Sequence, residues 1–158
     1  MGNRAVITIG KVDTNGKVLE TYESIKEEVG IYLHWNGGRD SVEAFLAYCD
    51  AKGYPSPDTD YYGWARMCQV IGNFFGGTGS LGIDKCCRLD CDNYDNGVYL
   101  IKDWKIVGRI YHEGGEQQHY DLLGMMMQIN TAQPESERLE EDYIKKYVEE
   151  LKNGSIKD

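Results

Sequence analysis

The chain has 158 residues and a formal net charge of −9, from 26 acidic and 17 basic side chains. The length predicts a single domain over residues 1–158, and the acidic balance excludes a general nucleic-acid partner, which would need a basic face to neutralise phosphates. No run of about 18 apolar residues occurs, so we expect no membrane partner either.

The first residues enter a strand pattern directly, without the apolar region of a signal peptide. The five cysteines are an odd number, which argues against a complete set of disulfides. Both features predict a cytoplasmic protein with reduced thiols.

Three strands are expected in the first 35 residues. Residues 4–9 form a short β-rich run, and the Asn-Gly pair at 15–16 favours a hairpin turn to a second short strand over 18–22. Residues 30–35 are almost continuously apolar or aromatic, which is typical of a strand in the middle of a sheet.

Two helices are expected next. Asp40 begins a capping-box pattern, so we expect it to be the N-cap of a helix that ends near Gly53. Apolar residues at helical spacing predict a second helix over 59–75, which stops at the glycine pair 76–77.

The remaining residues predict a β-meander over 81–112 and two further helices. The first helix covers 120–129 and is closed by Asn130, and the second is a charged amphipathic helix over 134–154. Together the elements predict an α+β fold, in which a mostly antiparallel sheet (an N-terminal hairpin plus a C-terminal meander) packs against helices.

Glycines at 76, 77, 79 and 82 suggest a loop that binds phosphate. The loop lacks the Gly-Lys-Ser/Thr ending of a P-loop, and it joins a helix to a strand, so no helix N-terminus follows to receive a pyrophosphate. Two interpretations remain open: a backbone nest that accepts an anion, and a plain connection.

A second candidate segment runs from His34 to Arg39, between the central strand and the helix that follows it. Backbone N–H groups at the start of that helix could hold an anion together with the Arg39 guanidinium. The alternative is a structural turn with Arg39 on the surface. Arg66 offers a similar choice, between a cation–π shelf for a planar ligand and a surface residue paired with an acid.

These segments define one candidate ligand site, in which glycine loops lie beside aromatic rings and arginines. Its residues are His34, Trp35, Asn36, Gly37, Gly38, Arg39, Arg66, Phe74, Gly76, Gly77 and Thr78.

No residue pattern specifies a metal, a cofactor or a catalytic set. Cys86, Cys87 and Cys91 lack the Cys-x2-Cys spacing of zinc sites, and their role stays open. The acidic run 90–97 misses the glycine and glutamate positions of an EF-hand, and residues 112–119 do not contain His-Glu-x-x-His.

The segment HWNGGRDSVEAFL at 34–46, with YGWAR at 62–66 and GNFFGG at 72–77, resembles an uncharacterised family of small phage and prophage proteins of Gram-positive bacteria. The resemblance implies a bacterial host cell and an anti-defence role. It supplies no catalytic residues.

Three functions follow as hypotheses. The first is a homo-oligomeric, non-enzymatic protein that sequesters a small anionic ligand, such as a cyclic nucleotide or an ADP-ribose derivative. The second is an interaction module that inhibits a host enzyme through its acidic surface. The third is a small hydrolase acting on nucleotides or peptides, with His34, His112 or His119 as the base.

Overall fold

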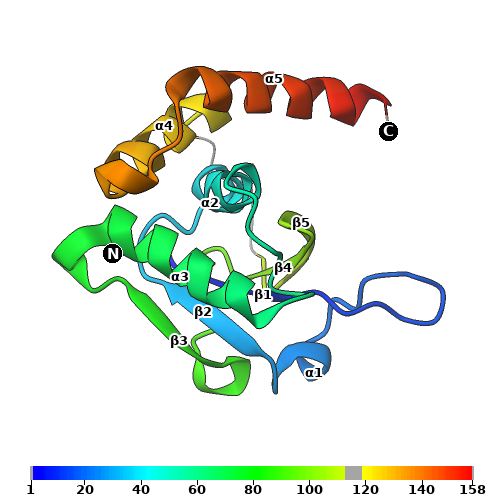
Figure 1. The fold of residues 1–158 in the computed structure, drawn as a ribbon. Coiled ribbons are helices and arrows are strands. Elements are labelled where there is room, and N and C mark those ends of the chain that lie inside the picture. Colours follow the sequence, from blue (N-terminus) through cyan, green and yellow to red (C-terminus); the bar gives the residue numbers. More distant parts are fainter. Residues whose placement is uncertain (1, 113–118, 158) are drawn as a thin grey trace.

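The computed structural model describes residues 2–112 and 119–157, which form a five-stranded sheet with most of the helices on one face (Figure 1). The strands are β1 (Ala5–Ile9), β2 (Val29–Leu33), β3 (Leu81–Lys85), β4 (Val98–Lys102) and β5 (Lys105–Ile110). The α-helices are α1 (Tyr22–Ile25), α2 (Arg39–Ala51), α3 (Tyr61–Phe75), α4 (Leu122–Ala132) and α5 (Glu141–Lys157). Three short 3₁₀ helices are η1 (Gly76–Thr78), η2 (Cys86–Arg88) and η3 (Glu135–Glu137).

The strand order in the sheet is β3-β2-β1-β4-β5. β1 pairs antiparallel with β2 and parallel with β4, while the β2–β3 and β4–β5 pairs are antiparallel. The expected α+β fold with a mostly antiparallel sheet packed on helices is therefore confirmed.

The strand arrangement differs from the expected one in two places. Residues 81–112 do not form one meander, because β3 pairs with β2 at one edge while β4 pairs with β1 and β5. Residues 18–22 do not form a strand either: Val18 makes one isolated bridge to Val12, and α1 begins at Tyr22. The Thr21 side chain caps α1 by accepting from the Ser24 N–H, which ends the extended backbone there.

The main core lies between the sheet and the helices. α2 contributes Phe45, Leu46 and Tyr48, each fully or almost fully buried, and α3 contributes Met67 and Ile71. Burial of one such side chain stabilises the fold by about 1.5–3 kcal/mol. The apolar spacing that predicts these two helices is thus the spacing that fills the core.

The opposite face of the sheet carries a smaller core. Val6, Val98 and Leu100 of the sheet pack against Ile25 of α1 and against Cys86, all of them buried. Both faces of the central strands are therefore covered, as their nearly continuous apolar sequence requires.

A buried amide joins α2, α4 and the segment that leads to α5. The Tyr48 hydroxyl donates to Asn130 Oδ1 over 2.6 Å, and the same oxygen accepts from the Leu139 N–H over 2.8 Å. Asn130 Nδ2 donates to the Leu139 carbonyl over 2.9 Å. Burial raises the pKa of Tyr48 to about 12, so its hydroxyl stays protonated at neutral pH.

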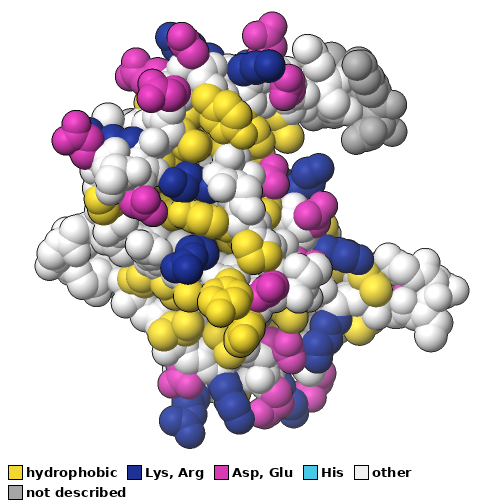
Figure 2. All heavy atoms as spheres, in the orientation of Figure 1, with side chains coloured by type: hydrophobic (Ala, Val, Ile, Leu, Met, Phe, Trp, Pro, Cys, Tyr) yellow, Lys and Arg dark blue, Asp and Glu magenta, His cyan; other side chains and the backbone are white. Residues whose placement is uncertain are grey.

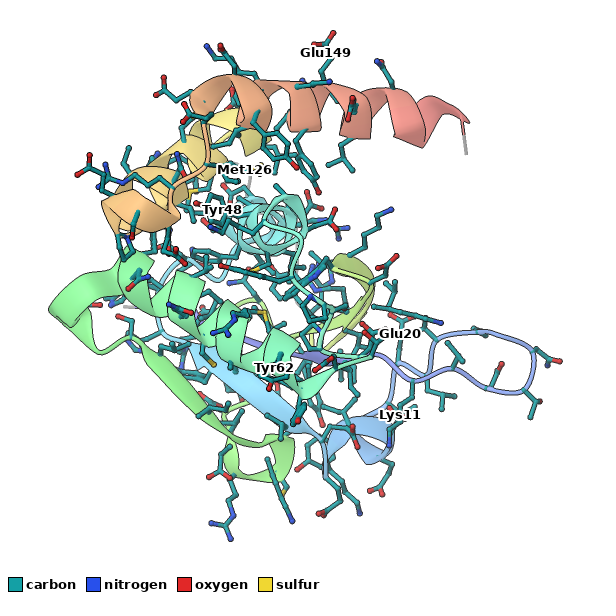
Figure 3. The ribbon with its side chains drawn as sticks, viewed as in Figure 1. Lys11, Glu20, Tyr48, Tyr62, Met126 and Glu149 are labelled. Atoms are coloured by element: carbon teal, nitrogen blue, oxygen red, sulfur yellow. The ribbon has the colours of Figure 1, made fainter. Side chains whose placement is uncertain are left out.

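These contacts revise two expected helix boundaries. Asn130 does not close α4, which continues to Ala132, because its side chain is used for packing against the next segment. The charged C-terminal helix starts at Glu141 rather than at 134, because residues 135–137 form the separate turn η3. Tyr48 and Met126 lie between α2 and α4 in Figure 3.

Replacing the shared amide should cost more stability than removing one of its partners. Asn130→Ala leaves the Tyr48 hydroxyl and both Leu139 backbone groups without their buried partner, so the free energy of unfolding should fall by about 2–3 kcal/mol. Tyr48→Phe removes one hydrogen bond and should cost about 1 kcal/mol. Urea denaturation measures both; equal losses would show that the amide does not act as the junction.

Candidate functional site

The first glycine loop begins where β2 ends. The His34 N–H donates to the Ser80 carbonyl over 3.0 Å, and the His34 carbonyl accepts from the Asn3 N–H over 2.8 Å. Its Nδ1 lies 3.0 Å from the Tyr32 hydroxyl, and the half-exposed Trp35 ring meets the imidazole edge-on at 5.1 Å between centroids. His34 is therefore held on both sides by the protein itself.

Gly37 is a packing position. Its N–H donates to the Asn3 carbonyl over 2.8 Å, and its carbonyl accepts from the buried Tyr99 hydroxyl over 2.7 Å. A Cβ at Gly37 would lie 2.5 Å from the Asn3 oxygen and 2.8 Å from Ala5 Cβ. Only glycine fits there, and its amide is already bonded, so it is not available to an anion.

The start of α2 differs from the expected capping box. Gly38 is the N-cap and provides no side-chain bond, while Asn36 turns the chain at φ 58° and donates from Nδ2 to Ser41 Oγ over 3.2 Å. Asp40, the expected N-cap, lies inside the helix. Its buried carboxylate accepts from the backbone N–H groups of His119 and Tyr120 instead.

The Asp40 carboxylate also places a negative charge at the N-terminus of α2. A carboxylate in the first turn already interacts with the positive end of the helix dipole. An added anion would meet a buried negative charge at the same place, which disfavours the anion site expected from the sequence.

The second glycine loop is an exposed reversal between α3 and β3. Gly76 and Gly77 are exposed, and a Cβ at either would meet no atom within 4 Å. Thr78 Oγ1 lies 3.0 Å from Ser80 Oγ. The structure brings the two loops together through the His34–Ser80 backbone bond, as β2–β3 pairing requires.

The other expected site residues lie away from these loops. The Phe74 ring packs edge-on against Phe45 at 5.3 Å between centroids, so it belongs to the core. Arg66 is ten residues before Gly76 on the same helix, about 15 Å along its axis, and its Nη1 donates to Gln69 Oε1 over 3.3 Å. The structure does not bring Arg66 to the glycine loops.

Arg39 lines a different hollow. It lies in the first turn of α2, and its Nε donates to Glu43 Oε1 in an ion pair of 2.6 Å. Both side chains border a cavity of about 380 Å³ between α2, β5, α4 and α5, which we call the α5 groove. Figure 2 shows the surface hollowed beneath α5, at the right of the view. The lining residues are Arg39, Glu43, Leu46, Ala47, Asp50, Trp104, Lys105, Ile106, Leu122, Tyr147, Glu150, Leu151 and Gly154.

The α5 groove combines an apolar wall with a charged rim. Leu46, Ile106 and Leu122 provide apolar surface from three different elements. Such a wall with a few polar groups, in a volume of about 300–1,000 Å³, is typical of small-molecule sites. The groove forms because α5 packs on α4 and then extends past it, over α2 and β5 (Figure 1).

Several rim groups already have partners. The Tyr147 hydroxyl donates to Asp50 Oδ2 over 2.6 Å, and burial together with this carboxylate raises the pKa of Tyr147, so it remains a neutral donor. The side chains of Lys105 and Glu150 have no ion-pair or hydrogen-bond partner among residues 2–112 and 119–157. They are the charges that a ligand can engage without breaking an existing contact.

Few features of the sequence predict this groove. Tyr147 and Leu151 belong to the apolar stripe of the predicted C-terminal helix, where packing is the ordinary explanation. Trp104 lies in the β4–β5 turn, at φ 61° and with its Nε1 donating to the Tyr54 carbonyl over 2.8 Å, and Lys105 is the first residue of β5. Only the tertiary arrangement brings these residues beside α2.

The cysteines show no metal-binding arrangement. Within the described ranges, no group of three or more His, Cys, Asp or Glu side chains is placed to hold a metal ion. Cys86 and Cys91 are buried, and the Cys91 thiol donates to the Cys86 carbonyl over 3.4 Å, while Cys87 is exposed. Hydrogen bonding to Cys86 and burial raise the pKa of Cys91, which keeps that thiol protonated.

Two of the three histidines are well separated. His34 follows β2 and His112 follows β5, and three strand spacings, about 14 Å, separate those strands. His119 is held through its backbone N–H by Asp40.

Comparison with protein-family models, with curated proteins and with solved structures finds no significant match to this chain. Among the described residues, no helix is both long enough and apolar enough to cross a membrane.

Replacing a glycine by alanine should change the free energy of unfolding differently in the two glycine loops. Gly37→Ala should lower the free energy of unfolding by about 1–3 kcal/mol, because the added Cβ overlaps the Asn3 backbone. Gly77→Ala should change it by less than about 0.5 kcal/mol, because the position is open. Thermal and urea denaturation give both values. A neutral Gly37→Ala would contradict the packing role.

Proposed function

We propose that the protein binds a small amphipathic ligand in the α5 groove and holds it without turnover. The observation that carries this proposal is the groove itself, a cavity of about 380 Å³ with an apolar wall and two unpartnered charges at its rim. None of the three histidines lines the groove, and no metal cluster occurs among the described residues, which favours binding over turnover.

The rim charges favour one class of ligand. Glu43, Asp50 and Glu150 contribute three carboxylates, against the two cations Arg39 and Lys105, which gives a net charge of −1. Arg39 is already paired with Glu43, so a ligand with several negative charges would face an acidic rim. A ligand with an apolar body and one positive group fits this arrangement best.

A nucleotide-type anion remains the competing proposal. Lys105 and Arg39 are the groove's cations, and a sponge for a nucleotide-derived immune signal is the role that the resemblance to phage proteins favours. Cyclic AMP and ADP-ribose therefore belong in the same binding panel.

An interaction module is the second candidate function, and α5 supports it. This helix carries acidic residues in its first turn and again at Glu149 and Glu150, and its C-terminal half extends past the sheet (Figure 1). The acidic run 90–97 is less available, because Asp90 and Asp95 both pair with Arg4. An inhibitor role would therefore depend on α5 more than on that run.

The charge at the rim of the α5 groove should determine whether the groove prefers a cationic or an anionic ligand. Tryptamine and indole-3-propionate share an indole body and differ in charge, so calorimetric titration with the two separates the apolar from the electrostatic contribution. The wild-type chain should bind tryptamine more tightly. Glu150→Lys should shift the ratio of the two affinities toward the anion by about two- to fivefold, since an exposed charge contact contributes about 0.2–1 kcal/mol.

Glu149→Lys is the matched control for that charge reversal. Glu149→Lys makes the same change in net charge, but the Glu149 side chain points away from the groove (Figure 3). This substitution should therefore leave the ratio of the two affinities unchanged. Equal effects of Glu149→Lys and Glu150→Lys would show that binding follows overall charge. Binding of cyclic AMP or ADP-ribose in preference to tryptamine would favour the nucleotide proposal.

Filling the groove should block binding without disturbing the fold. Gly154 lines the groove, and a Cβ there meets no atom within 4 Å, so Gly154→Trp adds bulk only to the open space. It should reduce tryptamine affinity at least tenfold while the unfolding midpoint stays constant. Asn153→Trp places the same bulk on an exposed, non-lining position of α5 and should bind normally. Unchanged binding by Gly154→Trp would exclude the groove.

A further inference from the structure

The two edges of the sheet are protected very differently. At β5, the outward N–H of Arg109 donates to Glu20 Oε2 over 2.9 Å, and Val18 lies against Gly108. The β4–β5 pairing also has a bulge between Leu100 and Ile101. Glu20 is seen beside this edge in Figure 3. Covered and bulged edges are the usual protection against pairing with another chain.

No element of the described residues covers the β3 edge in this way. Its five residues pair with β2 in an unbroken register, and no strand or helix lies outside it in Figure 1. The Cys86 N–H donates to the Glu28 carbonyl, so by alternation the backbone groups of Gly82 and Asp84 face β2. Those of Leu81, Ile83 and Lys85 therefore face outward.

The outward groups are open to a partner at the middle of the strand. Asp84 Oδ1 accepts from the Lys85 N–H, but the backbone groups of Leu81 and Ile83 have no outward partner among the described residues. The Ile83 side chain is 55% exposed. An exposed isoleucine on an edge strand with regular pairing is a template for strand addition.

We propose that β3 pairs antiparallel with β3 of a second copy of this chain, which joins two five-stranded sheets across a twofold axis. Outward-facing residues must pair with outward-facing residues, so the axis passes through a residue position, and only Gly82, Ile83 or Asp84 keeps at least three residues of the strand paired. An axis at Asp84 would place two carboxylates opposite each other. An axis at Ile83 uses all five strand residues, brings the two isoleucines together and sets Lys85 opposite Leu81.

Strand pairing alone buries too little surface for a stable dimer, which needs about 1,200–2,000 Å². α3 supplies a second layer, because it packs over β3, where Gly72 adjoins Leu81. Three α3 residues recur at helical spacing and are left exposed by the part of the chain that the structure describes: Tyr62, Ala65 and Gln69. In the dimer this stripe faces α3 of the other copy, and the small Ala65 permits close approach.

This inference is independent of the proposed function. The α5 groove lies on the β5 side of the sheet, so ligand binding can fail while the dimer forms, and the reverse also holds.

Light scattering coupled to size-exclusion chromatography, over a range of protein concentrations, tests the proposal on the full chain. The wild-type protein should have twice the mass of one 17.9 kDa chain. Ile83→Asp should be a monomer with unchanged circular dichroism, because it places two carboxylates on the axis. Ala65→Arg should raise the dimer dissociation constant at least tenfold through the helix layer.

Tyr94→Asp is the matched control, because Tyr94 is 79% exposed and lies outside the sheet. It should remain a dimer. A wild-type chain that stays monomeric into the millimolar range would overturn the proposal. A dimer that survives Ile83→Asp would place the interface elsewhere. If the chain is a monomer that captures an unrelated extended peptide at β3, the partner of β3 is that peptide and not a second copy.

Discussion

The close contact between Gly37 and the N-terminal strand is the constraint on which the rest of the structure depends. A backbone that touches Asn3 and Ala5 and accepts from Tyr99 fixes the turn between β2 and α2. The position of this turn fixes the direction in which α2 crosses the sheet. α4 packs on α2 and α5 packs on α4, so the position of the α5 groove follows from this one junction.

The glycines of the two loops are explained by the backbone geometry of the chain itself. Gly37 is surrounded by protein atoms, Asp40 places a buried carboxylate in the first turn of α2, and Gly76 and Gly77 lie open to solvent. Glycine is needed here for two different reasons, close packing in one loop and chain reversal in the other. The packing and the path of the chain account for both positions, and the groove offers space, apolar surface and unpartnered charge together.

Local patterns in the sequence predicted the helices well and the contacts between distant segments poorly. Apolar spacing identified α2 and α3, because the same residues fill the core. Asp40 has the spacing of a capping residue, but its carboxylate is used by residues 119–120, which no local pattern reveals. β3 and β4 follow each other along the chain yet lie three positions apart in the sheet, because β1 takes β4 as its parallel neighbour. The groove combines segments near 39–50, 104–106 and 147–154, so its composition could not be predicted from any one of them.

We expect a ligand to enter the α5 groove and to leave the glycine loops untouched. Amide chemical shifts during a tryptamine titration of ¹⁵N-labelled protein test this claim directly. The amides of Ala47, Ile106 and Leu151 should shift together and saturate, while those of Gly37 and Gly77 stay in place. Shifts that concentrate at Gly37 and Gly77, with the groove amides unchanged, would contradict it.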